Sequence, residues 1–156
     1  MFLRMERKVS IRRAVATDAD QAAAMFTAVM KQRTFAPKFH SDEEDRAYIA
    51  ERITDDEMWV AVVDGRVIGL ACLKDDCLMQ LHVDPAQQNC GIGTALLDHV
   101  KYQRPGGFDL WTFQANKGAR RFYERHGLEA VERTDGERNE EQLPDVRYAW
   151  LPVLEV

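Results

Sequence analysis

The chain has 156 residues, of which 46% are hydrophobic and 30% are charged, a composition typical of a single globular domain with a sizeable core. The formal net charge is −5 and there is no basic stretch that would displace counterions from phosphates, which argues against a nucleic-acid partner. No run of about 20 apolar residues is present, so a membrane partner is not expected either.

Local composition also argues against a signal peptide and against a disulfide framework or metal site. The basic residues at positions 1–8 are followed by no apolar segment, so a signal peptide is not expected and a cytoplasmic location is. The three cysteines, Cys72, Cys77 and Cys90, form neither an even set nor a CxxC pair. We therefore expect a reducing compartment and no metal site.

The first third of the chain predicts one strand and two helices. Residues 9–14 are typical of a short strand, and apolar residues then recur at helical spacing after Asp18, the expected N-cap. Residues 31–40 include a proline and predict a loop. Ser41 and Glu44 match a capping box, which begins a helix that is expected to run to about Ile53.

The rest of the chain alternates between strand and helix patterns. Asp64-Gly65 is a strong hairpin signal between two β-rich runs, and Gly127 is expected to end the last helix. The expected strands are 58–63, 67–73, 77–83, 108–113, 128–133 and 146–151, and the expected helices are 93–103 and 117–126. This order predicts one α/β domain over residues 1–156, with a mixed, mostly antiparallel sheet and helices on its faces.

A glycine loop between a strand and a helix is the most informative segment, and it reads Gln88, Asn89, Cys90, Gly91, Ile92, Gly93, Thr94. The first N–H groups of a helix have no internal partner and lie at its positive end, so glycines there form an anion cradle suited to a pyrophosphate. A Rossmann loop would need a third glycine where Leu96 stands, and a Walker loop would need Gly-Lys-Ser/Thr. The loop alone also fits a helix start with purely structural glycines.

The wider pattern resembles the GCN5-related N-acetyltransferase (GNAT) family. Gln88-x-x-Gly91-x-Gly93 after a Val-Asp-Pro strand end is similar to the family's glycine signature. Asn116, Ala119 and Phe122-Tyr123 resemble its second motif, and the element order agrees over residues 9–152. The resemblance implies acetyl-CoA as co-substrate and a parallel strand pair, 77–83 and 108–113, that splays apart at the cofactor.

The resemblance also implies roles for individual residues. The main chain of Leu81, His82 and Val83 would bond the pantetheine arm, and Gln88 with the N–H groups from Asn89 to Thr94 would hold the pyrophosphate. Asn116 would contact the cofactor near the thioester, and Tyr123 would protonate the departing sulfur. From the residues alone, Tyr123 also fits a core aromatic on a helical stripe.

The general base is left open by the sequence. Strict alternation puts Cys77 and Met79 on one face of the strand and Gln80 and His82 on the other, so His82 is the only ionisable candidate there. The alternatives are that His82 only packs, or that a more distant residue removes the proton through water.

The predicted function is an N-acetyltransferase that moves an acetyl group from acetyl-CoA to a primary amine of a small molecule or peptide by direct attack in a ternary complex. The alternatives are a different acyl-CoA donor or a non-catalytic acyl-CoA-binding module; by resemblance alone, a homodimer is expected. Candidate walls of the acceptor pocket are Phe35, Phe39, His40, Tyr48, Trp59, Trp111 and Tyr148, with the acidic loop 137–145 as a site of attraction for cations.

Overall fold

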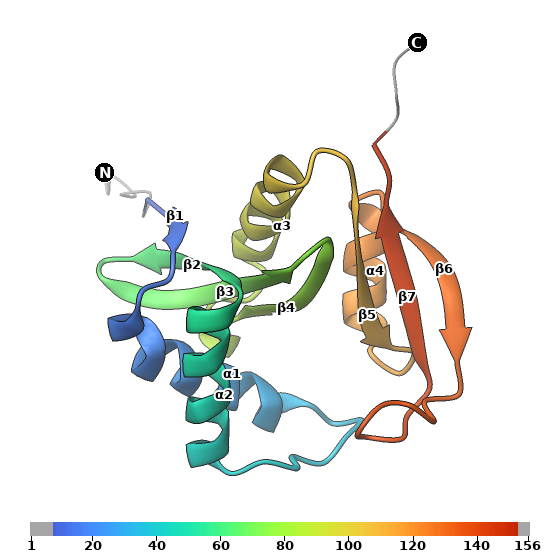
Figure 1. The fold of residues 1–156 in the computed structure, drawn as a ribbon, viewed down its shortest axis with the longest axis horizontal. Coiled ribbons are helices and arrows are strands. Elements are labelled where there is room, and N and C mark those ends of the chain that lie inside the picture. The colour runs from blue at the N-terminus through green and yellow to red at the C-terminus, as the bar shows by residue number, and fades with distance from the viewer. Residues whose placement is uncertain (1–7, 153–156) are drawn as a thin grey trace, which may run out of the picture.

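The computed structural model describes residues 8–152 (Figure 1). The segment 1–7, on which the expectation about a signal peptide largely rests, lies outside this range. The helices are α1 Ala19–Gln32, α2 Asp42–Asp55, α3 Ile92–Gln103 and α4 Lys117–Arg125, with short 3-10 turns at Ala16–Asp18 and Pro85–Gln87. The strands are β1 Ser10–Arg13, β2 Glu57–Val63, β3 Arg66–Lys74, β4 Cys77–Val83, β5 Phe108–Phe113, β6 Glu129–Thr134 and β7 Asp145–Trp150.

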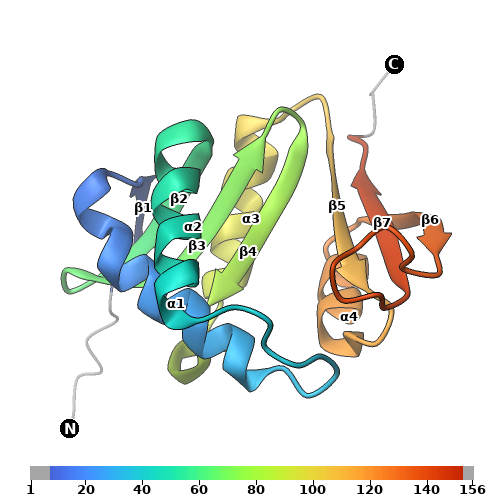
Figure 2. The same ribbon diagram turned by 60° about the horizontal axis from the view of Figure 1, so that its bottom comes forward.

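The seven strands form one sheet in the order β1-β2-β3-β4-β5-β7-β6. Every neighbouring pair is antiparallel except β4 and β5, which are parallel. These two strands register at one position, Cys77 with Asp109, and then diverge. Figures 1 and 2 show the sheet in two parts on either side of this divergence. The expected mixed, mostly antiparallel fold with a splayed parallel pair is confirmed.

Helices cover both faces of the sheet, and each face has its own core. Helices α1 and α2 pack over β2 and β3 around Phe26, Ile49 and Leu70, all of which are buried. Helices α3 and α4 cover the opposite face around Leu97 and Tyr148, which are fully buried. The opening between β4 and β5 therefore joins the two faces of the sheet.

A β-bulge in β4 changes which side chains face each core. Cys72 on β3 pairs with Gln80 and Leu73 pairs with Leu78, so Met79 has no partner position. The extra residue moves Leu78 to the same face as Leu81, because the side-chain alternation restarts after the bulge. The face assignment from strict alternation was therefore wrong for the first half of this strand, although Gln80 and His82 do share a face.

The two predicted helix starts near the N-terminus had different outcomes. Ser41 Oγ accepts the N–H of Glu44 at 3.1 Å, and Glu44 returns a carboxylate oxygen to the N–H of Ser41 at 3.0 Å, so the capping box is confirmed. Asp18 does not cap α1 with its side chain. Its carboxylate instead binds Arg12 at 2.7 Å and accepts the N–H of Val15, because a 3-10 turn precedes the helix.

Within residues 8–152, no helix is both long and apolar enough to cross a membrane. The same residues contain no group of three or more His, Cys, Asp or Glu side chains placed to hold a metal ion.

Candidate active site

The first candidate site, the cofactor cleft, lies where β4 and β5 separate. It has a volume of about 760 Å³. The end of β4, the loop before α3, the last turn of α1 with the loop after it, and the start of α4 line it. Of the expected cofactor residues, Leu81, His82, Val83, Gln88, Asn89, Gly91, Gly93, Thr94, Asn116 and Tyr123 line this cleft.

The glycine loop is shaped by local hydrogen bonds and by two left-handed residues. The Asp84 carboxylate accepts the N–H of Ala86 at 2.9 Å and so fixes the turn that leaves β4. Asn89 has a φ of 65° and Gly91 a φ of 82°, a conformation that favours glycine because it has no Cβ. A Cβ added at Gly91 would meet nothing within 4 Å, so the space above this position is open.

Helix α3 begins at this loop without a side-chain cap. Gly91 is the N-cap, and the helix backbone bonding starts with the N–H of Ala95 donating to the Gly91 carbonyl at 3.0 Å. The N–H groups of Ile92, Gly93 and Thr94 come before that bond and have no intrahelical acceptor. They lie at the positive end of a 12-residue helix, which is a suitable place for an anion.

Gln88 joins three elements beside this cradle. Its amide nitrogen donates to the Val83 carbonyl at 3.2 Å and to Gln32 Oε1 at 3.1 Å. The end of β4, the glycine loop and the last residue of α1 are thereby held together. Gln32 also lines the cleft, and nothing in its sequence context had singled it out.

Two residues that were expected to bind the cofactor, Ile92 and Cys90, do not line the cleft. The Ile92 side chain is buried in the core under α3, and Cys90 is exposed outside the cleft lining. The predicted contribution of Cys90 and Ile92 to cofactor binding is therefore limited to their main-chain N–H groups in the loop.

Asn116 has a structural role as well as a place in the cleft. It is the N-cap of α4, and its Oδ1 accepts the N–H of Ala119 at 3.2 Å. This bond fixes the first turn of the helix that carries Tyr123. The contact with the cofactor that the resemblance implies is therefore left to the Nδ2 side of the amide.

Tyr123 is 8% exposed and packs between Phe122 and Tyr148, with ring centroids 5.4 and 6.0 Å away. Burial raises the pKa of its phenol, with no charged or hydrogen-bonding neighbour contributing. The side chain lines the cleft even though it belongs to the core. The two interpretations of Tyr123 from the sequence, core aromatic and site residue, are thus compatible.

His82 lies on the other side of β4, against α1. Its Nε2 is 2.6 Å from Gln80 Oε1, and its ring meets Phe26 edge to face at 5.3 Å. Burial, and after it the charge of Arg33, lowers the pKa of His82 to about 4. The imidazole is therefore neutral near pH 7, but it is a weak base.

A second cavity, the acceptor cavity, has a volume of about 750 Å³ and adjoins the first. Both are lined by Arg33, Leu81, His82, Asn116 and Tyr123. Arg33 follows α1 in a segment without hydrophobic periodicity, so no sequence pattern had indicated it as a site residue.

Of the seven residues expected as walls of an acceptor pocket, five line the acceptor cavity: Phe35, Phe39, His40, Tyr48 and Trp111. Trp59 and Tyr148 do not line it. Trp59 packs on His99 with ring centroids 4.2 Å apart, and Tyr148 is fully buried in the core beside β5.

The comparisons with known proteins agree with this geometry. Residues 54–129, which contain β4, the glycine loop and α4, match the family model described as "Acetyltransferase (GNAT) domain". The matched segment is similar to the GNAT family, as the two sequence motifs predicted. An uncharacterised N-acetyltransferase from Methanocaldococcus jannaschii is 33% identical over 100 residues, which cover 53% of this chain and 43% of that relative. The match thus spans less than half the length of that protein.

Solved structures share the GNAT fold over nearly the whole chain. A GCN5-related N-acetyltransferase from Rhodopseudomonas palustris aligns with a TM-score of 0.79 at 23% identity, over 95% of this chain and 99% of its own. YjaB from Escherichia coli, solved in its apo form, aligns with a TM-score of 0.76 at 21% identity, over 94% and 99%. YncA from Salmonella typhimurium, solved with acetyl-CoA, has a TM-score of 0.73 at 15% identity, over 96% of both chains. These similarities establish the fold.

Proposed function

We propose that this protein is an N-acetyltransferase that moves the acetyl group of acetyl-CoA to a primary amine of a small molecule or peptide, by direct attack in a ternary complex. The observation that carries the proposal is the meeting of two cavities at Tyr123 and Asn116. One cavity contains a helix N-terminus fit for a pyrophosphate, and the other has room for an acceptor.

The residues of the cofactor cleft fit acetyl-CoA. The N–H groups of Ile92, Gly93 and Thr94 would hold the pyrophosphate, and the open space above Gly91 would admit it. The edge of β4 that diverges from β5 leaves main-chain groups near Leu81 and Val83 for the pantetheine amides. When bound, acetyl-CoA supplies the thioester that the amine attacks.

Tyr123 is proposed as the proton donor to the departing sulfur. A tyrosine phenol is protonated at neutral pH, as a proton donor must be, and burial raises the pKa of Tyr123 further. Such proton transfer from a positioned acid accelerates reactions by roughly 10²–10⁴-fold.

His82 is a poor match for the general base. A base works best with a pKa near the operating pH, and His82 has a pKa of about 4. We propose that the amine loses its proton through water and that His82 orients Gln80 at the cavity wall. The weak base is also the feature that favours the alternative of a non-catalytic acyl-CoA-binding module.

The deciding experiment combines titration calorimetry with turnover. Acetyl-CoA is titrated into the protein, and CoA release is then followed with a panel of primary amines. Micromolar binding together with steady, amine-dependent CoA release supports the enzyme. Binding without release by any amine would support the binding module, and no binding would contradict both.

A further inference from the structure

The acceptor cavity has an unusually apolar mouth. Of the eight large hydrophobic side chains that are exposed among residues 8–152, Phe39, Met79 and Trp111 line this one cavity. They are 49%, 44% and 43% exposed. Water-exposed apolar side chains that gather at a concave site mark contact with an apolar part of a ligand.

Charge at the same cavity is predominantly negative. Five carboxylates line it, against two permanent cations, Arg33 and Lys38. Both cations are largely buried. Lys38 pairs with Asp45 at 2.7 Å, whereas Arg33 lies 3.9 Å from Glu141 and its Nε has no hydrogen-bond partner. Neither cation is exposed at the mouth, where the exposed charges are carboxylates.

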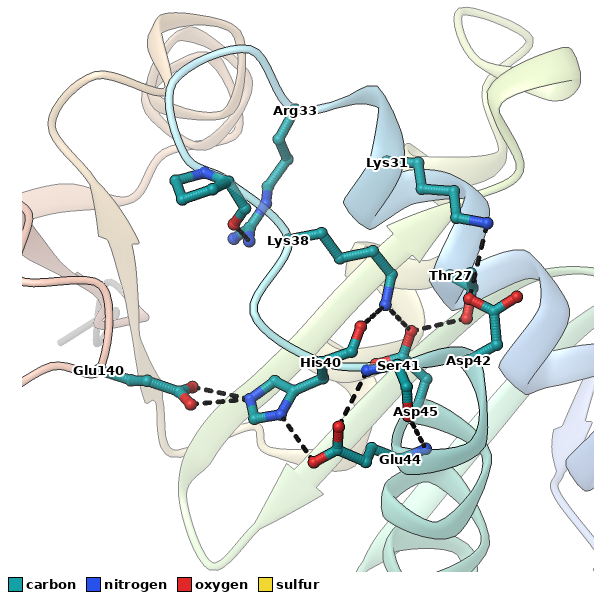
Figure 3. Close-up of polar contacts among 11 residues, drawn as sticks. Thr27, Lys31, Arg33, Lys38, His40, Ser41, Asp42, Glu44, Asp45 and Glu140 are labelled. Carbon is teal, nitrogen blue, oxygen red and sulfur yellow. Dashed lines mark hydrogen bonds and ion pairs between the residues drawn. The ribbon is translucent and has the colours of Figure 1, made fainter.

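The three remaining carboxylates are exposed. The side chains of Glu44, Glu51 and Glu140 are 63%, 64% and 56% exposed. Glu44 and Glu140 approach His40 from α2 and from the β6–β7 loop, and Figure 3 shows the imidazole between the two carboxylates. His40 lies 3.5 Å from Glu44 and 2.8 Å from Glu140. At the mouth, a ligand thus meets two carboxylates that share one imidazole.

A polar group at the inner end of the cavity also lacks a partner. Tyr123 is more than nine-tenths buried, lines the cavity, and has no hydrogen-bonding neighbour affecting its hydroxyl. It belongs to the core on the α3–α4 face, whereas Glu44 lies in the first turn of α2 on the opposite face. The cavity thus runs through the opening of the sheet from a carboxylate rim to the Tyr123 hydroxyl.

We infer that the acceptor is an amphipathic amine that carries a second positive charge. Its reacting amine would lie at the Tyr123 end, its apolar body against Phe39, Met79 and Trp111, and its second cation at the exposed carboxylates of Glu44 and Glu140, beside His40. This inference rests on the proposed acetyl transfer for the reaction, but the binding preference follows from the cavity alone.

The test uses a matched set of amines. 1,4-Bis(aminomethyl)benzene has an aromatic body and two cations, 4-methylbenzylamine has the same body and one cation, and 4-(aminomethyl)benzoate replaces the second cation by an anion. 1,4-Diaminobutane keeps both cations without the ring. Each is titrated into the protein with and without CoA by calorimetry at pH 8, and its acetylation is measured separately.

The expected order of affinity is the aromatic diamine first and the benzoate last. The Glu44→Gln/Glu140→Gln variant should weaken the aromatic diamine about five- to tenfold and leave 4-methylbenzylamine unchanged, because each exposed charge contributes modestly. Glutamine at position 44 preserves the capping box. The matched control is Glu43→Gln/Glu137→Gln, which removes two exposed charges from the same helix and the same loop, outside the cavity lining.

The outcomes separate this inference from the proposed function. Charge-dependent binding without acetylation would support the ligand class and contradict the enzyme. Acetylation with equal affinity for one and two cations, preference for the benzoate, or no binding of any amine would overturn the ligand class. Equal losses in the rim variant and in its control would overturn the site.

Discussion

The imidazole Nε2 of His82 lies 2.6 Å from Gln80 Oε1, and Gln80 in turn donates its amide nitrogen to the Tyr48 hydroxyl at 3.0 Å. Because the Gln80 oxygen faces the ring, Nε2 carries the hydrogen and donates it. Nδ1 is therefore the unprotonated nitrogen of a neutral imidazole. The chain Tyr48–Gln80–His82 fixes this tautomer along one wall of the acceptor cavity.

This arrangement predicts how His82 titrates. The pKa of His82 is lowered to about 4, whereas an unfolded histidine titrates near 6.5. Between these pH values the unfolded chain binds a proton that the folded chain does not, so unfolding is favoured as the pH falls. The free energy of unfolding should fall by about 2–3 kcal/mol at pH 4 through this group.

NMR titration of the His82 ring and denaturant unfolding between pH 4 and 7 would measure both effects. His82→Gln should remove this share of the pH dependence while leaving that of other groups in place. A His82 that titrates near 6.5 would contradict the assignment and restore it as a candidate base.

Tyr123→Phe removes only the hydroxyl, so the packing against Phe122 and Tyr148 is retained. We expect kcat to fall by roughly 10²-fold or more, with the affinity for acetyl-CoA unchanged, because the proposed role is proton transfer. Steady-state kinetics and calorimetry on the same preparation measure the two quantities. An unchanged kcat would remove Tyr123 from the mechanism.

Gly91→Asp tests the anion cradle. The new side chain has open space around it, although the left-handed backbone makes it strained by about 1 kcal/mol. The added negative charge should weaken acetyl-CoA binding at least tenfold. The matched control is Gly91→Asn, which has nearly the same shape and backbone strain without the charge. If both variants bound acetyl-CoA equally well, electrostatics at the helix N-terminus would not be the cause.

The ring of His40 should titrate above its ordinary range. Hydrogen bonding to Glu140, and then to Glu44, raises the pKa of His40. The pKa of His40 is higher in the folded chain than in the unfolded chain. Its pairing with the two carboxylates therefore stabilises the fold below pH 6.5, and this stabilisation is lost as the pH rises through the folded pKa. Glu140→Gln should shift the His40 pKa downward in an NMR titration, and Glu137→Gln, in the same loop, should leave it in place.

Asp45 is 3% exposed and accepts both the Thr27 hydroxyl and the Lys38 ammonium at 2.7 Å (Figure 3). Asp45→Ala leaves both partners without their acceptor and should lower the free energy of unfolding by about 3–5 kcal/mol. Thr27→Val removes only the hydroxyl and should cost about 1 kcal/mol. Urea unfolding at pH 7 measures both; similar losses would show that the ion pair with Lys38 adds little.

The sequence was sufficient wherever a structural rule is local. The capping box at Ser41, the turn at Asp64-Gly65 and the glycine loop before α3 depend on residues within a few positions of one another, and each lies where it was expected. The order of strands and helices followed from hydrophobic periodicity, and with the two motifs it was enough to indicate the family.

What the tertiary structure decided are the relationships between distant segments. The bulge at Met79, the burial that lowers the His82 pKa, and the contact of His40 with Glu140 a hundred residues away depend on packing between elements. Hydrophobic periodicity within one helix or strand does not predict which other element packs against it. Desolvation of a side chain depends on the assembled fold. The loop therefore predicted an anion cradle at the start of α3, whereas the acceptor cavity exists only where the folded chain brings α1, α2, α4 and the β6–β7 loop around the opening between β4 and β5.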